Sequence, residues 1–136
     1  MLRRLTKSLN GFGRPVRSST DTCFCKQLFA DDHVVETGTC YGETTELLST
    51  FANKVYTIEP EPSLFSRAKQ KFSDNPRVTV INQLSETALP ELLPLVDGDV
   101  YFWLDGHYSG GDTFAGPNDT PLVHELNEIS RHVSRL

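Results

Sequence analysis

A glycine-containing turn and an acidic residue further along the chain have the types and spacing needed to bind a nucleoside ligand. Residues 36–42 read Glu-Thr-Gly-Thr-Cys-Tyr-Gly, and Gly38 and Gly42 would let the backbone turn sharply and approach a ligand closely. Glu59 lies about 20 residues further on, where nucleotide-binding α/β folds place an acid that accepts hydrogen bonds from ribose hydroxyls. The alternatives are a tight turn that binds nothing and an ordinary solvated carboxylate.

Polar residues are also concentrated directly after a later apolar run. Asp105, Gly106 and His107 follow the apolar residues 101–104. Asp105 could orient a substrate, hold a divalent metal or lie beside a cationic group of a cofactor. His107 could accept a hydroxyl proton, because histidine titrates near neutral pH. For His107 the alternative is a hydrogen bond that only stabilises the loop.

Four short runs rich in β-branched and aromatic residues alternate with stretches of helical periodicity, which predicts an α/β fold with a parallel sheet. The expected strands cover 33–37, 54–59, 77–82 and 99–105. The expected helices cover 43–52, 62–73, 86–95 and 119–133. Right-handed crossovers through strands 1, 2 and 3, with a reversal to strand 4, predict the order 3-2-1-4 in a Rossmann-like three-layer sandwich. In this order the glycine turn and the Asp105 loop meet at one edge of the sheet.

Two of the expected helices carry apolar stripes that indicate their buried sides. In the second helix, which has a proline in its first turn, the stripe consists of Leu64, Phe65, Ala68 and Phe72. In the last helix, which Asp119 is expected to cap, the stripe consists of Leu122, Leu126, Ile129 and Val133.

Basic charge is concentrated at the start of the chain. The net charge is −5, but residues 1–20 contain five basic and no acidic residues, so residues 21–136 carry a net charge of −10. We therefore expect a basic N-terminal arm, 1–20, and one domain, 21–136. The acidic domain argues against nucleic acid as a partner, because phosphate binding needs clustered Lys and Arg. The arm either docks on the domain or is an organelle-targeting or membrane-surface segment, and no apolar run reaches the length of about 18 residues that spans a bilayer.

The cysteines indicate reduced thiols. There are three, Cys23, Cys25 and Cys40, and an odd, small number without a secretory leader favours a cytoplasmic location. Cys23 and Cys25 could begin a zinc site, but no second Cys or His pair follows at ligand spacing.

The glycine turn resembles the first motif of the class I S-adenosylmethionine-dependent methyltransferases. The pattern is Glu36-x-Gly38-x-x-x-Gly42, with Cys40 where a third glycine is usual. The dinucleotide fingerprint of NAD-binding folds, Gly-x-Gly-x-x-Gly, needs one more glycine at a different spacing. S-adenosylmethionine is therefore favoured over NAD as the ligand.

Further segments extend the resemblance over about residues 30–133, most closely to the small-molecule O-methyltransferase-like branch. Glu59 resembles the acid that ends the second strand, residues 82–85 the segment that lines the adenine, and residues 101–107 the fourth strand with its catalytic-face loop. The resemblance implies S-adenosylmethionine as cofactor, bound by Glu36, Gly38, Thr39, Gly42, Glu59, Pro60, Ser85 and Asp105. It also implies that Asp105 and His107 are catalytic residues facing the methyl acceptor.

The implied function is an enzyme that transfers a methyl group from S-adenosylmethionine to an oxygen or nitrogen of a small-molecule acceptor. The family resembled has seven strands in the order 3-2-1-4-5-7-6, whereas four are predicted here, which implies a C-terminally truncated fold. The alternative function is a truncated, non-catalytic fold that binds a nucleoside or a partner chain. A divalent metal would need further oxygen ligands, which metal-dependent relatives supply beyond strand 5. An uncovered strand 4 would let two copies pair as a homodimer.

Overall fold

The computed structural model describes residues 32–106 and 121–133, which form four strands and four helices. The strands are β1 His33–Thr37, β2 Lys54–Ile58, β3 Val78–Ile81 and β4 Val100–Leu104. The helices are α2 Glu43–Ser49, α3 Pro62–Lys71, α4 Ser85–Leu92 and α5 Leu122–Val133, and a 3₁₀ turn, Leu93–Leu95, follows α4. Every predicted element is present, and the strand ends agree with the sequence to within one residue.

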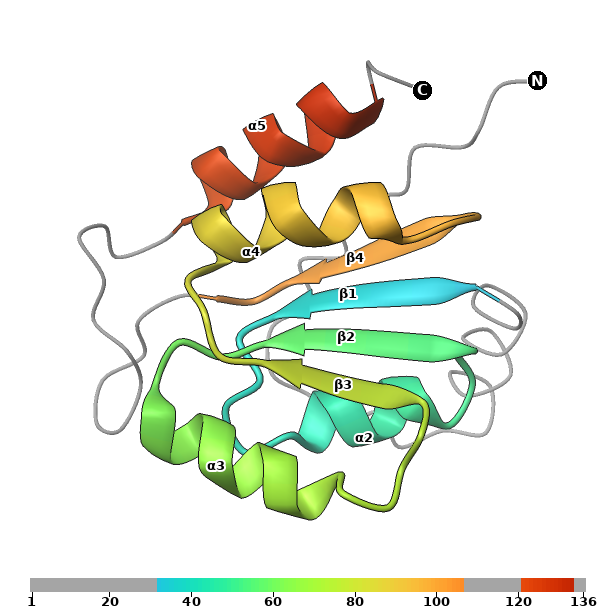
Figure 1. Cartoon of the computed structure of the whole chain (residues 1–136), viewed down its shortest axis with the longest axis vertical. Helices are drawn as coiled ribbons and strands as arrows, with labels where there is room; N and C mark the ends of the chain where they lie inside the picture. The colour runs from blue at the N-terminus through green and yellow to red at the C-terminus, as the bar shows by residue number, and fades with distance from the viewer. Residues whose placement is uncertain (1–31, 107–120, 134–136) are drawn as a thin grey trace.

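All four strands run parallel in one sheet of order β3-β2-β1-β4, which confirms the predicted order. The register pairs Thr37 with Ile58 on one side and with Leu104 on the other, so β1, β2 and β4 end level. Helices α2 and α3 cover one face of the sheet, and α4 and α5 cover the other (Figure 1). The fold is therefore the predicted three-layer α/β sandwich, and the segments that follow β1, β2 and β4 share one edge.

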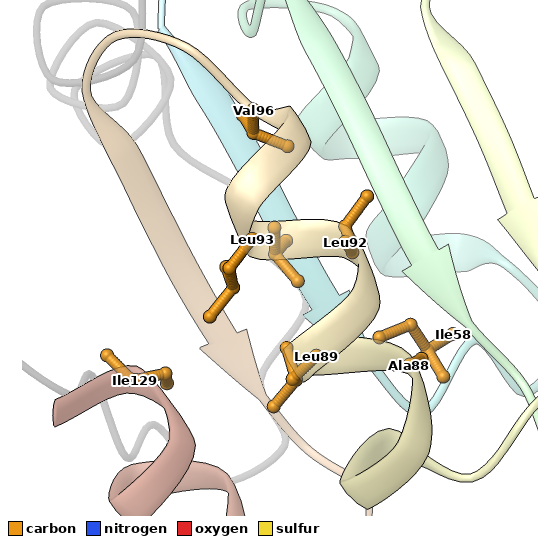
Figure 2. Packing of buried hydrophobic residues seen from close by; sticks show 8 residues of the cluster. Ile58, Ala88, Leu89, Leu92, Leu93, Val96 and Ile129 are labelled. Carbon is orange, nitrogen blue, oxygen red and sulfur yellow. The ribbon is translucent and has the colours of Figure 1, made fainter. Parts of the chain in front are cut away.

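Burial on both faces explains the continuous apolar run of β1. Val34 and Val35 are adjacent in sequence but point to opposite faces of the sheet. On the α2 side the buried core consists of Val34, Leu48, Phe51, Ala52 and Val55. On the α4 and α5 side it consists of Val35, Ile58, Ala88, Leu89, Leu92, Leu93, Val96 and Ile129 (Figure 2). Because each large aliphatic side chain contributes about 1.5–3 kcal/mol on burial, these clusters hold the helices on the sheet.

Local signals determine where α3 begins and which side it buries. The Glu61 side chain caps the helix by accepting a hydrogen bond from a backbone N–H of the first turn, where Pro62 also lies. Its buried side is formed by Leu64, Ala68 and Phe72, with Phe65 half-buried. The apolar stripe predicted for this helix is therefore confirmed.

Helix α5 is rotated relative to the stripe predicted for it. Ile129 is buried and Leu122 is half-buried, whereas Leu126 is 48% exposed and Val133 is 39% exposed. Glu125, which the sequence places outside the stripe, is only 1% exposed. The prediction that all four apolar residues are buried is wrong, because α5 packs through the side that carries Glu125 and Ile129. Its predicted cap, at position 119, lies outside the described residues.

Several predictions concern segments that the structure does not describe. The basic arm, 1–20, lies outside the described residues, and so do Cys23 and Cys25. Within 32–106 and 121–133, no helix has the length and apolar character needed to cross a membrane. In the same two ranges, no group of three or more His, Cys, Asp or Glu side chains is arranged to hold a metal ion.

Candidate functional site

Gly38 and Asp105 are in contact across the ends of β1 and β4. The Asp105 N–H donates to the Thr37 carbonyl at 3.0 Å, and the Gly38 N–H donates to the Ile58 carbonyl at 2.9 Å. Gly38 has a φ of 87°, and a Cβ atom at this position would lie 2.5 Å from the carbonyl oxygen of Asp105. Any larger residue would displace the backbone here. The glycine turn, residues 38–42, and the segment after β4 therefore meet at the sheet edge, as the strand order predicts.

Glu59, directly after β2, braces the glycine turn. Its Oε2 accepts a hydrogen bond from the Cys40 N–H at 2.8 Å, and its Oε1 accepts one from the Glu61 N–H at 2.9 Å. Asn82, after β3, donates from Nδ2 to the carbonyls of Glu59 and Pro60 at 2.8 and 3.2 Å. Burial raises the pKa of Glu59, and the two backbone N–H donors oppose part of this shift. A carboxylate oxygen has two lone pairs, so each oxygen can accept a further hydrogen bond from a ligand hydroxyl.

A fully buried carboxyl group, that of Glu36, lies behind the glycine turn on the α2 side of β1. Its Oε2 accepts hydrogen bonds from the hydroxyls of Thr45 at 2.5 Å and Thr57 at 2.7 Å. The hydroxyls of Thr39 and Thr57 lie 2.6 Å apart and extend this network to the turn. Burial raises the pKa of Glu36 to about 7, although the Thr45 and Thr57 hydroxyls counter the effect. Its Oε1 is buried and has no hydrogen-bond partner among the described residues.

Three carboxyl groups, those of Glu36, Glu59 and Asp105, lie close to one another around the glycine turn. Besides burial, which is the main cause, the charges of Asp105 and Glu59 raise the pKa of Glu36. Burial likewise raises the pKa of the Cys40 thiol, and the charges of Glu59, Glu43 and Asp105 add to that shift. Carboxylates that act on one another in this way favour a cationic ligand group at the same edge.

The end of helix α3 contacts the last two residues of the glycine turn, Tyr41 and Gly42. Lys71 Nζ donates to the carbonyls of Tyr41 and Gly42 at 3.4 and 3.3 Å, and it forms an ion pair with Glu46 at 2.9 Å. A Cβ atom on Gly42 would lie 2.8 Å from the ring of Phe72. Gly42, which the sequence assigns to ligand binding, therefore also has a packing role between the turn and α3.

The predicted site residues fall into three groups in the fold. The residues that meet at the sheet edge are Gly38, Glu59, Pro60 and Asp105, of which Asp105 is exposed. Those behind or beside the turn are Glu36, Thr39 and Gly42. Ser85 is buried and begins α4 on the opposite face of the sheet. His107 lies outside the described residues.

One acidic residue near this edge, Glu125, is not predicted by the sequence. A Cβ atom on Gly106 would lie 3.2 Å from Thr37 Oγ1 and 3.4 Å from Glu125 Oε1. Burial raises the pKa of Glu125, and the nearby Ser85 and Thr37 hydroxyls counter part of the shift. Even so, neither Glu125 Oε1 nor Thr37 Oγ1 has hydrogen-bonding geometry with any described group. The only feature of the sequence that indicates a buried position for Glu125 is its place one helical turn before Ile129.

Comparisons with known proteins find structural neighbours only. No protein-family model matches the chain, and no curated protein matches it. A candidate methyltransferase from Streptococcus mutans, solved in complex with S-adenosylhomocysteine, is 19% identical with a TM-score of 0.58 over 93% of this chain and 68% of its own. An rRNA methylase from Streptococcus thermophilus is 18% identical with a TM-score of 0.55 over 93% of this chain and 67% of its own. Precorrin 8w decarboxylase from Methanobacterium thermoautotrophicum is 19% identical with a TM-score of 0.52 over 88% and 59%.

The chain spans about two thirds or less of the length of each of these neighbours. The likeness shows that the chain has the same Rossmann-like α/β fold as the two proteins from Streptococcus. This confirms the fold class predicted from the alternation of strands and helices.

Proposed function

We propose that the chain binds S-adenosylmethionine at the edge where β1, β2 and β4 end, and transfers its methyl group to an acceptor. The observation that carries this proposal is the contact between Gly38 and Asp105. It brings the glycine turn, the acid after β2 and the polar segment after β4 to one edge, where ligands bind in open α/β sheets.

The charge at this edge supports a sulfonium cofactor. Burial is the main cause of the raised pKa of Glu36. The charges of Asp105 and Glu59, which lie nearby, raise this pKa further. A sulfonium cation is attracted to such a cluster, whereas the pyrophosphate of NAD would meet like charges. The missing third glycine of the dinucleotide fingerprint points the same way.

The residues around the turn have distinct parts in the proposed binding. Glu59 accepts hydrogen bonds from the ribose hydroxyls through the lone pairs that its backbone donors leave. Glu36 and Thr39 act indirectly, because their buried network fixes the shape of the turn. We assign Pro60, which lies after β2, to the ribose side of the cofactor. We assign Ser85, the first residue of α4, to the adenine side.

The proposed reaction needs alignment and removal of one proton. Bound S-adenosylmethionine supplies an electrophilic methyl group on a sulfonium. Asp105 is exposed beyond the end of β4, where it would orient the oxygen or nitrogen of the acceptor in line with that group. His107, two residues further on, would accept the acceptor's proton.

A small molecule is the acceptor that the charge distribution favours. The neighbour from Streptococcus thermophilus is an rRNA methylase, so RNA is the competing acceptor. However, residues 21–136 carry a net charge of −10, and binding to a phosphate backbone depends on clustered positive charge.

Turnover on the full chain tests the proposal. We would measure S-adenosylhomocysteine by mass spectrometry with panels of hydroxylated and aminated small molecules, and separately with rRNA. We expect product with a small acceptor, reduced about 100-fold or more in Asp105→Asn and in His107→Gln, the range for losing a general acid–base group or its orientation. Turnover with RNA alone would contradict the acceptor class. Cofactor binding without any turnover would favour the non-catalytic, nucleoside-binding alternative.

We also propose that two copies pair through β4. Among the described residues β4 is the outermost strand beside β1, and its sequence, Val-Tyr-Phe-Trp-Leu, is apolar and aromatic. Strands of this composition at the edge of a sheet can pair with another chain. Light scattering should give the mass of a dimer, and a monomer at all concentrations would contradict this pairing.

A further inference from the structure

The end of α3 holds the glycine turn through one ammonium group. Lys71 Nζ lies within hydrogen-bonding distance of the Tyr41 and Gly42 carbonyls, at 3.4 and 3.3 Å, and 2.9 Å from Glu46. It also lies 5.4 Å from the centroid of the Phe72 ring. These contacts join residues that are 29 and 30 positions apart in sequence, so Lys71 links the end of α3 to the turn.

The Lys71 ammonium lies beside the N-terminus of α2, where the dipole of this helix disfavours a positive charge. Gly42 is the N-cap of α2, and the positive end of a helix dipole disfavours a cation. Glu43 and Glu46 in the first turn of α2 offset this effect. At this position Lys71 contacts two carbonyls of the turn and the Glu46 carboxylate.

A second basic residue of α3 contacts the same segment. Arg67 lies one helical turn before Lys71, and its guanidinium carbon is 5.1 Å from the centroid of the Tyr41 ring. The side chain of Tyr41 and its carbonyl are therefore both contacted from α3. In the same turn, the Cys40 N–H donates to the carboxylate of Glu59, which follows β2. The turn is fixed between β2 and α3.

We propose that Lys71 is a positioning residue that acts through Tyr41 and Gly42 to hold the glycine turn in the shape that binds the cofactor. This inference rests on the function proposed above. It assigns to α3, which follows the second strand, a part in cofactor affinity that requires no contact between Lys71 and the cofactor.

The test uses three variants of the full chain. Lys71→Ala removes the ammonium, Lys71→Arg keeps a cation with several donors, and Lys69→Ala removes an equal charge from the same helix without a contact to the turn among the described residues. For each, calorimetry gives the Kd for S-adenosylhomocysteine, and hydrogen exchange gives the protection of the amides of residues 38–46. Thermal unfolding reports whether the fold is retained.

In Lys71→Ala we expect Kd to rise about tenfold, the scale for losing a charged hydrogen-bond donor, with faster exchange confined to residues 38–46. Lys71→Arg should restore both properties to within about threefold, and Lys69→Ala should match the wild type. Unchanged Kd in Lys71→Ala, or an equal loss in Lys69→Ala, would overturn the inference while leaving the proposed function intact. A wild-type chain that binds no S-adenosylhomocysteine would refute the proposed function and this role together, whereas the exchange data would still show whether Lys71 orders the turn.

Discussion

Gly38 and Gly98 have the same backbone φ, 87°, but they differ in what surrounds them. A Cβ atom on Gly38 would lie 2.5 Å from the carbonyl oxygen of Asp105, whereas one on Gly98 would meet nothing within 4 Å. Both positions have a left-handed backbone, but only Gly38 also lies in close contact with the segment after β4. Comparing substitutions at the two glycines therefore distinguishes the effect of backbone strain from the effect of this contact.

Gly38→Ala should destabilise the chain more than Gly98→Ala. Both substitutions introduce left-handed strain of about 1–2 kcal/mol, and Gly38→Ala adds overpacking of about 1–3 kcal/mol. Urea unfolding measures both free energies. Equal losses in the two variants would show that the Gly38 and Asp105 backbones are not in close contact.

Glu36 should make the stability depend on pH. Burial raises the pKa of Glu36 from 4.5 to about 7, so the native state binds more protons than the unfolded state between these values. The contribution of Glu36 to the free energy of unfolding is therefore fully present below pH 4.5. It is lost as the pH rises from there through about 7, and the loss amounts to up to about 3 kcal/mol.

The matched variant for this prediction is Glu36→Gln, which resembles the protonated carboxyl group. Burial also raises the pKa values of Glu59 and Glu125, but these groups are present in both proteins. The difference in unfolding free energy between wild type and Glu36→Gln should therefore change between pH 5 and pH 8. A difference that is constant over this range would mean that Glu36 is charged throughout.

Two residues of α5 test how that helix packs. Ile129→Ala should lower the free energy of unfolding by about 2–5 kcal/mol, because Ile129 is buried between α5 and α4. Leu126→Ala should lower it by less than about 1 kcal/mol, because Leu126 is 48% exposed. Chemical denaturation of both variants decides this, and a larger loss for Leu126→Ala would restore the orientation that the apolar stripe predicts.

The fold could be predicted because its signals are local. Short β-branched runs and intervening helical periodicity give the elements, and right-handed crossovers combined with a reversal to strand 4 give the order 3-2-1-4. The orientation of α5 could not be predicted in the same way. Periodicity shows which residues share a side, but the buried position of Glu125 depends on the ends of β1 and β4, to which no local pattern refers.

The candidate site could be predicted in part for a related reason. Residues that follow parallel strands meet at one edge, so the approach of Gly38 to Asp105 follows from the strand order alone. The hydrogen bond from Thr57 to Glu36 depends on the register of β1 with β2. The contacts of Lys71 with the turn depend on how far α3 extends. These relations appear only when the strands and helices are assembled.

Glu59→Ala should weaken binding of S-adenosylhomocysteine by about 1–3 kcal/mol, the scale for leaving buried polar partners unmatched. Glu43→Ala is the control, because it removes the same charge from an exposed position beside the turn. Calorimetry on both variants, with unfolding curves to confirm the fold, measures the difference. Unchanged affinity in Glu59→Ala would remove Glu59 from the binding site.

The central claim, that the edge formed by β1, β2 and β4 binds S-adenosylmethionine, is tested most directly by calorimetric titration of the full chain with S-adenosylhomocysteine and, separately, with NAD. We predict saturable binding of one S-adenosylhomocysteine per chain and no binding of NAD. Binding of NAD, or absence of binding by S-adenosylhomocysteine to a folded chain, would contradict the claim.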